Sequence, residues 1–175
     1  ILGHIIARTE QDWLKLKITT GTLGQAVAPD VCYLALRGVR TLSVRLEEHQ
    51  KNAIEVANWL NKRPEVETIL HPAFPSCPGH EIWQRDFTGS SGLFSIVLKD
   101  FSVEQVNAML DDMDYFSMGF SWGGYESLIV PCDPTKIRSA TKWNASGPLL
   151  RIHVGQEDVQ DLIQDLERGL TRLSG

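Results

Sequence analysis

A single arginine stands in the middle of an apolar segment, 149–154, near the end of the sequence. Because side chains alternate along a strand, Arg151 and His153 share one face of this segment and their apolar neighbours share the other. A charged group in such a segment needs a partner. One interpretation is an edge strand on which Arg151 lies in solvent, paired with Glu157 or Asp158. The other is a guanidinium that binds a small carboxylate through two parallel hydrogen bonds.

The segment 120–127, which reads Phe-Ser-Trp-Gly-Gly-Tyr-Glu-Ser, carries paired glycines among aromatic side chains. Gly123 and Gly124 allow a tight turn and a close approach of the backbone to a ligand. Together with Ser121, such a loop can present backbone amides to an anion. It can equally be a hairpin turn whose aromatic side chains fill the core. The sequence leaves both interpretations open.

Two further segments resemble parts of cofactor-binding sites but lack features that such sites need. The segment 139–143 contains Lys142 in a context that suggests a Schiff base with pyridoxal phosphate, but such a lysine needs a desolvated amine. A polar connector follows at 144–147, so we expect Lys142 to be exposed and not catalytic. The glycine-containing loop 85–92 lacks the helix and lysine of a phosphate loop, so it does not predict nucleotide binding.

The composition argues against several classes of protein. The 17 basic and 22 acidic residues give a net charge of −5, which disfavours nucleic acid or an anionic membrane as a partner. No apolar run approaches the roughly 18 residues of a membrane span. The 5 histidines and 3 cysteines lack metal-ligand spacing, so no metal is expected. The odd number and wide spacing of the cysteines predict a reducing, cytoplasmic location.

The elements that must position these residues follow from caps, breakers and hydrophobic periodicity. Thr9 can cap a first helix, which the glycines from Gly21 onward end. Asp30 can cap a much longer helix that reaches Asn61. Gly38 is a possible break within it.

The rest of the chain alternates strands with helices after a proline-rich loop, 71–80. A capping box at Ser102 and Gln105 starts one helix, and the pair Asp133-Pro134 can start another. The expected strands are 66–70, 92–98, 116–120, 127–130 and 149–154, and the expected helices are 102–113 and 157–173. This alternation predicts an α/β fold, with an α+β C-terminal domain in which helices cover a small sheet.

Four segments of the sequence form one recognisable pattern. They are 79–83, 85–95, 121–128 and 150–155. In this order they resemble the pyridoxal-phosphate-dependent enzymes of cysteine and methionine metabolism, which have fold type I. Trp122 favours the cystathionine β-lyase branch over the γ-lyase and γ-synthase branches. The resemblance implies pyridoxal 5′-phosphate as cofactor, a small amino acid as substrate and a homo-oligomer, usually a tetramer.

The β-lyase branch implies a carbon–sulfur lyase of methionine biosynthesis, which converts L-cystathionine to homocysteine, pyruvate and ammonia by α,β-elimination. Residues 1–50 resemble the tail of the large cofactor-binding domain with its connecting helix, and residues 51–175 resemble the small C-terminal domain. The alternatives are a non-catalytic fragment or interaction module, and a γ-lyase or γ-synthase relative.

The resemblance also implies roles for individual residues. Arg151 matches the arginine that binds the substrate α-carboxylate, and Ser121 and Trp122 match residues that line the same site. In the family the Schiff-base lysine lies just upstream of a Gly-His pair, which Gly3-His4 matches. We therefore expect that lysine just before Ile1 and no catalytic residue within this chain. The resemblance leaves the cofactor-binding residues of this chain unknown.

Overall fold

The computed structural model describes residues 2–173 of the chain. These residues form two compact units that divide between Ser43 and Val44. None of the described helices combines the length and the apolar character that crossing a membrane requires.

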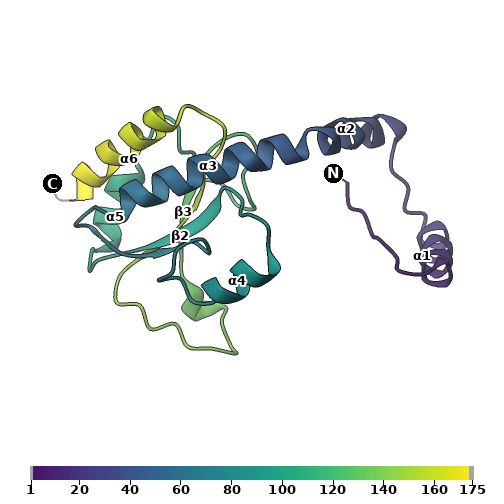
Figure 1. Ribbon diagram of the computed structural model, residues 1–175, viewed down its shortest axis with the longest axis horizontal. Helices are drawn as coiled ribbons and strands as arrows, with labels where there is room; N and C mark the ends of the chain where they lie inside the picture. Colours follow the sequence, from purple (N-terminus) through teal and green to yellow (C-terminus); the bar gives the residue numbers. More distant parts are fainter. Residues whose placement is uncertain (1, 174–175) are drawn as a thin grey trace. The chain divides into compact units, whose positions relative to one another are not determined.

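The N-terminal unit contains two helices, α1 (Glu10–Thr22) and α2 (Pro29–Arg40) (Figure 1). Helix α1 begins where the sequence predicts, because the Thr9 hydroxyl accepts a hydrogen bond from the Asp12 backbone N–H at 3.2 Å. Gly24 follows the helix with a φ of +66°, a left-handed conformation that glycine adopts readily. Neither helix has a buried residue. The exposed large apolar side chains of the two helices are Trp13, Leu14, Ile18, Tyr33, Leu34, Leu36 and Val39.

The long helix predicted for 30–61 is interrupted at Thr41, where α2 ends and α3 (Leu42–Leu60) begins. The backbone N–H and the hydroxyl of Thr41 both donate to the carbonyl of Gly38, at 3.3 and 3.4 Å. A hydroxyl that bonds the backbone competes with helical hydrogen bonding. The predicted break is therefore confirmed, and it follows Gly38 instead of coinciding with it.

The C-terminal unit is built on a four-stranded antiparallel sheet in the order β1-β2-β4-β3. The strands are β1 (Val66–Leu70), β2 (Leu93–Leu98), β3 (Leu128–Cys132) and β4 (Leu149–His153). One face of the sheet packs against α3, α5 (Val103–Leu110) and α6 (Val159–Leu173), and their buried side chains form one apolar core (Figure 1). The predicted fold class, a small sheet covered by helices, is confirmed.

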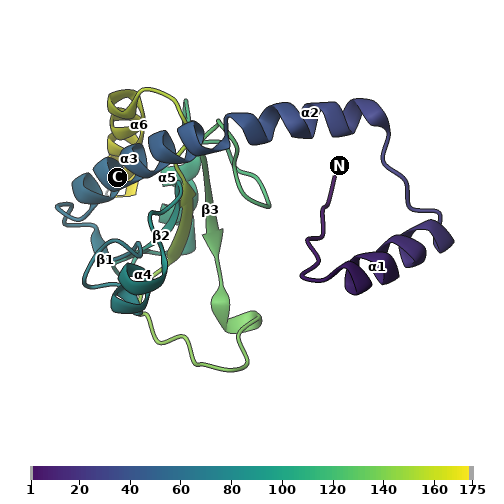
Figure 2. The same cartoon turned by 45° about the vertical axis from the view of Figure 1, so that its right-hand side comes forward.

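Several elements were predictable from short-range signals. Strand β1 has the predicted bounds, and β2 and β4 each differ from prediction by one residue. The capping box is present, since Gln105 N–H donates to the Ser102 hydroxyl at 3.3 Å and Ser102 N–H donates to the Gln105 side chain at 2.9 Å. Asp133 caps only a single 3-10 turn, η1 (Pro134–Lys136), which continues directly from β3 (Figure 2).

Two expectations are wrong, and one helix was not predicted. The helix expected to reach residue 113 ends at Leu110, and 116–120 is not a strand, because only Ser117 forms a bridge, with Leu128. At the start of the expected strand, the carboxylate of Asp165 in α6 accepts the backbone N–H of Phe116 at 3.2 Å, and it also accepts those of residues 114 and 115 at 3.0 and 2.8 Å. The N–H of Phe116 is therefore not available for strand pairing. The unpredicted helix, α4 (His80–Asp86), follows the proline-rich loop.

Asp165 is fully buried and also accepts a hydrogen bond from Arg168 at 3.1 Å. Burial raises the pKa of this carboxyl, but the three backbone donors and Arg168 outweigh burial and hold the pKa below its ordinary value. The carboxylate thereby ties 114–116, the segment that leads into the 120–127 loop, to helix α6.

Replacing Asp165 with alanine should lower the free energy of unfolding by about 3 kcal/mol or more, because three backbone N–H groups lose a charged acceptor. The matched control is Asp161→Ala on the same helix, whose carboxylate accepts the exposed Tyr115 hydroxyl at 3.4 Å. Its cost should stay within about 0.5 kcal/mol. Urea unfolding followed by circular dichroism measures both. Equal losses in the two variants would contradict the role of Asp165.

His71 is a fully buried histidine directly after β1, in contact with the rings of Phe74 and Phe94. Its Nδ1 accepts the Ala73 N–H at 3.1 Å, so the proton of the neutral ring lies on Nε2. Nε2 has no hydrogen-bond partner within the described part of the chain. Burial lowers the pKa of His71 from 6.5 to about 4.

Between pH 6.5 and about 4 the unfolded chain binds a proton at His71 that the folded chain does not bind. Stability therefore falls as the pH drops through that window, by about 3 kcal/mol at its lower end. His71→Asn keeps an acceptor for the Ala73 N–H and removes the titration. Its unfolding free energy should therefore fall less steeply over the same window, as measured by urea titrations at several pH values. Parallel pH curves for the variant and the unmodified chain would refute this origin of acid sensitivity.

Candidate functional site

Strand β4 lies inside the sheet, between β2 and β3, so the edge-strand interpretation of Arg151 is wrong. The alternation along the strand is as predicted. Leu150 and Ile152 are fully buried in the core, and Arg151 is half-buried on the opposite face. In the strand register Arg151 lies between Ser95 of β2 and Val130 of β3. The guanidinium therefore leaves the sheet from its middle and not from its rim.

The Arg151 guanidinium has no acidic partner within 4 Å among residues 2–173. One of its terminal nitrogens donates to the carbonyl of Ser121. The two acids expected beside it are engaged elsewhere. Glu157 accepts the backbone N–H and the hydroxyl of Ser127 at 2.7 and 2.9 Å, and Asp158 accepts a backbone N–H of α6 at 2.8 Å. The expected ion pair is therefore wrong, and the guanidinium keeps donors for a carboxylate ligand.

The aromatic side chains of the 120–127 loop do not fill the core. Phe120, Trp122 and Tyr125 are 98%, 71% and 65% exposed, so the core-filling interpretation of the loop is wrong. Ser121 has a φ of +67°, a left-handed conformation that is uncommon for serine and that often marks a ligand site. Exposed aromatic rings next to a half-buried guanidinium form a surface suited to a ligand with apolar and anionic parts.

Several hydrogen bonds fasten this loop to β4 and to the segment that follows it. They are Arg151 to the Ser121 carbonyl, His153 Nε2 to the Gly124 carbonyl at 2.9 Å, Gln156 N–H to the Tyr125 carbonyl at 2.9 Å, and the two bonds from Ser127 to Glu157. Gly123 lies against the His153 ring, and a Cβ at this glycine would be 2.1 Å from Cδ2 of the ring. Gly123 therefore permits a close approach of the loop backbone to the ring of His153.

The structure brings together two of the three residues expected at the substrate site and places the third beside them. Ser121 is bonded to Arg151 through its carbonyl, and Trp122 is its exposed neighbour in the loop. The anchor between Glu157 and Ser127 was missed, because no spacing in the sequence links a loop serine to an acid 30 positions further on.

No lysine among residues 2–173 lies in the enclosed setting that a Schiff base needs. Every lysine of the chain is exposed, and Lys142 lies in an exposed connector, as predicted. Because a nucleophilic lysine requires a desolvated amine, residues 2–173 do not fit the complete cofactor site. Nor do the described His, Cys, Asp and Glu side chains form a group of three that could hold a metal ion. Arg151 and the 120–127 loop remain as the candidate site, a half-buried guanidinium beside a loop with exposed aromatic side chains.

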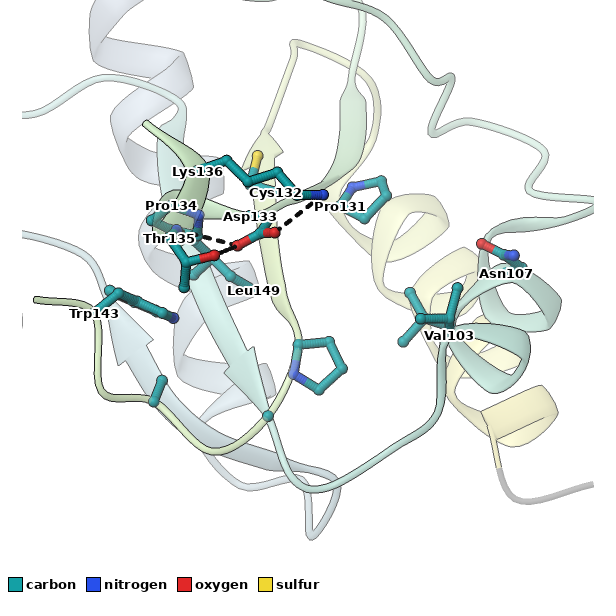
Figure 3. Close-up of a pocket in the computed structure, with 14 residues that line it drawn as sticks. Val103, Asn107, Pro131, Cys132, Asp133, Pro134, Thr135, Lys136, Trp143 and Leu149 are labelled. Atoms are coloured by element: carbon teal, nitrogen blue, oxygen red, sulfur yellow. Dashed lines mark hydrogen bonds and ion pairs between the residues drawn. The ribbon is translucent and has the colours of Figure 1, made fainter. Parts of the chain in front are cut away.

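A pocket of about 470 Å³ lies elsewhere in the C-terminal unit, beside α5 (Figure 3). Its polar side chains bond one another, since Asp133 accepts the Thr135 hydroxyl and pairs with Lys136 at 3.3 Å. Much of the remaining wall is apolar and includes Val103 and Trp143. None of the three residues expected at the substrate site lines this pocket. The pocket is therefore separate from the candidate site around Arg151.

Comparison with known proteins shows the family of the chain. The sequence model of one family, the Cys/Met metabolism PLP-dependent enzymes, matches residues 1–171. Over 178 residues the chain is 46% identical to the cystathionine beta-lyase of Haemophilus influenzae, covering 99% of this chain and 45% of that protein. Over 175 residues it is 43% identical to the L-alanine/L-glutamate racemase of Wolbachia pipientis, covering 99% of this chain and 43% of that protein.

A crystal structure of cystathionine gamma synthase from Xanthomonas oryzae, in complex with aminoacrylate and cysteine, matches the fold. The TM-score is 0.83 at 32% sequence identity, and the match covers 97% of this chain and 45% of that chain. The chain thus spans less than half the length of each of these relatives. The chain belongs to the family of Cys/Met metabolism PLP-dependent enzymes, whose cofactor is pyridoxal 5′-phosphate.

Proposed function

We propose that this chain carries the substrate-carboxylate half of a carbon–sulfur lyase that acts on L-cystathionine by α,β-elimination. The proposal rests on the environment of the Arg151 guanidinium. It is half-buried on a central strand, has no acidic partner among the described residues, and is bonded to a loop with exposed aromatic side chains. A guanidinium in this state is suited to the α-carboxylate of an amino acid, which it can bind through two parallel hydrogen bonds.

The roles within the site follow from this contact. Arg151 holds the α-carboxylate, and Ser121 and Trp122 lie beside it. Fixing the carboxylate fixes the direction of the Cα–H bond, and orientation of this kind lowers the barrier of the chemical step. The electron-sink chemistry belongs to the cofactor. The lysine that carries the cofactor lies outside the described residues in the whole protein.

The proposal extends to the architecture of the whole protein. Residues 1–50 form the tail of the cofactor-binding domain with its connecting helix, and residues 51–175 form the small C-terminal domain of a homotetramer. Support comes from helices α1 and α2, which have no buried residue and expose large apolar side chains. Apolar surface of this extent is typical of a face that is covered by other protein.

The choice of reaction rests on the β-lyase relative and on Trp122, and product analysis distinguishes it from the alternatives. α,β-Elimination of cystathionine releases pyruvate and homocysteine, whereas γ-elimination releases 2-oxobutyrate and cysteine. A racemase releases neither keto acid. A non-catalytic module leaves cystathionine unchanged in the whole protein. Pyruvate as the keto acid formed from cystathionine is therefore the expected result, and any of the other three results would contradict β-lyase activity.

Replacing Arg151 with alanine in the whole protein should lower kcat/KM for cystathionine by about 10-fold to 100-fold, because a charge-assisted contact worth roughly 1.5–3 kcal/mol is lost. Most of the loss should appear in KM. Arg151→Lys keeps the charge without the two-pronged geometry and should give an intermediate value.

The matched control for this experiment is Arg85→Ala. Arg85 is exposed and pairs with its neighbour Asp86 at 2.8 Å, away from the 120–127 loop in sequence. Its kinetics should equal those of the unmodified enzyme. Unchanged kinetics in Arg151→Ala would remove the basis of the proposed function.

A further inference from the structure

We propose that His153 is a positioning residue of the carboxylate site, which holds residues 121–124 in the conformation that lets Arg151 and Ser121 meet the substrate. The inference rests on the proposed function, because it concerns the same site. It adds a residue that does not itself touch the substrate and acts through the loop.

The geometry begins with strand β4, which presents Arg151 and His153 on the same face. Arg151 donates to the Ser121 carbonyl, and His153 Nε2 lies 2.9 Å from the Gly124 carbonyl. Two side chains of one rigid strand therefore hold two carbonyls of one loop. The segment between these carbonyls contains Trp122, so its position follows from both contacts.

The bond to Gly124 fixes the protonation of the ring. A carbonyl oxygen only accepts, so Nε2 of His153 must carry a proton. Nδ1 is buried and has no hydrogen-bond partner among residues 2–173. A second proton on Nδ1 would therefore place a charge in a buried position without an acceptor. The ring is a neutral donor to the loop.

The surroundings of the ring favour the same state. Burial lowers the pKa of His153, and the neighbouring His49 of α3 and Arg151 of β4 lower it further. The bond to Gly124 and the carboxylate of Glu157 act in the opposite direction, but the net pKa lies below the ordinary value. His49 already has a hydrogen-bond partner, because its Nδ1 lies 2.9 Å from the Val154 carbonyl. Its ring centroid lies 5.2 Å from that of His153.

Gly123 shows that the loop is shaped around this ring. A Cβ at Gly123 would lie 2.1 and 2.8 Å from two carbon atoms of the imidazole, and 2.8 Å from the Glu126 carbonyl. Any other residue at this position would push the ring and the loop apart. The glycine is therefore needed for contact with His153, and the contact continues the bond to Gly124.

The C-terminal end of the loop has an anchor of its own. Glu157 binds both the N–H and the hydroxyl of Ser127, and the same hydroxyl accepts the Gly155 N–H at 2.8 Å. Loss of the His153 donor therefore leaves residue 127 in place and frees the Gly124 carbonyl, which lies between the contact of Arg151 with Ser121 and that of Gln156 with Tyr125. The expected consequence is a weaker carboxylate site in a protein that still folds.

The test compares two variants of His153 in the whole protein. His153→Leu removes the donor, and His153→Gln keeps an N–H at a similar distance from the backbone. We expect His153→Leu to raise KM for cystathionine about 10-fold while kcat changes by less than about 3-fold. His153→Gln should restore KM to within about 3-fold of the unmodified value. Equal losses in both variants would overturn the inference, because a purely structural role does not depend on the donor.

A double variant tests whether His153 acts through the Arg151 site. In the Arg151→Ala background, His153→Leu should add less than about 2-fold to the loss in kcat/KM, because the contact that the loop supports is already absent. Effects that multiply would mean that His153 acts independently of that site and would overturn the inference.

The controls separate failure of this inference from failure of the proposed function. His80→Leu also removes a histidine contact to a carbonyl, that of Pro72 at 2.7 Å, in a different loop. It should leave KM unchanged. If Arg151→Ala has normal kinetics, the proposed function fails and this inference with it. If Arg151→Ala is impaired and His153→Leu is normal, only the role of His153 is overturned.

Discussion

The alternation of side chains along one central strand is the constraint on which the rest of the site depends. Leu150 and Ile152 are fully buried against the helices, so Arg151 and His153 must leave the sheet on its other face. Because β4 has a neighbouring strand on each side, Arg151 cannot reach solvent at a rim. The same burial that stabilises the core thus fixes the direction of the two polar side chains.

The loop is preorganised around these side chains by contacts at both of its ends. Asp165 holds the backbone before it at residues 114–116, and Glu157 holds Ser127 at its end. A loop that is ordered before the ligand arrives loses less conformational entropy on binding. The exposed aromatic side chains are therefore not a sign of a loose segment. They lie on a backbone whose course is determined by the core, by the buried Asp165 and by the half-buried Glu157.

Local signals in the sequence were sufficient where the interaction itself is local. The bounds of β1, the capping box at Ser102 and the alternation in β4 each depend on residues within a few positions. Contacts between distant segments were not predictable in this way. Whether Arg151 lies on an edge or a central strand depends on the strand order, and Asp165 binds the backbone N–H groups of residues 49 to 51 positions before it. The pairing of Arg151 with Ser121 was expected only from family resemblance, because neither segment alone indicates the other.

A crystal structure of the whole protein with pyridoxal phosphate and an unreactive analogue of cystathionine would test the central claim most directly. We expect the two α-carboxylate oxygens to lie about 2.7–2.9 Å from two nitrogens of Arg151. Ser121 and Trp122 should lie beside the carboxylate, and His153 should still be bonded to Gly124. A carboxylate held by another group, with Arg151 bonded to protein atoms alone, would contradict the proposed site.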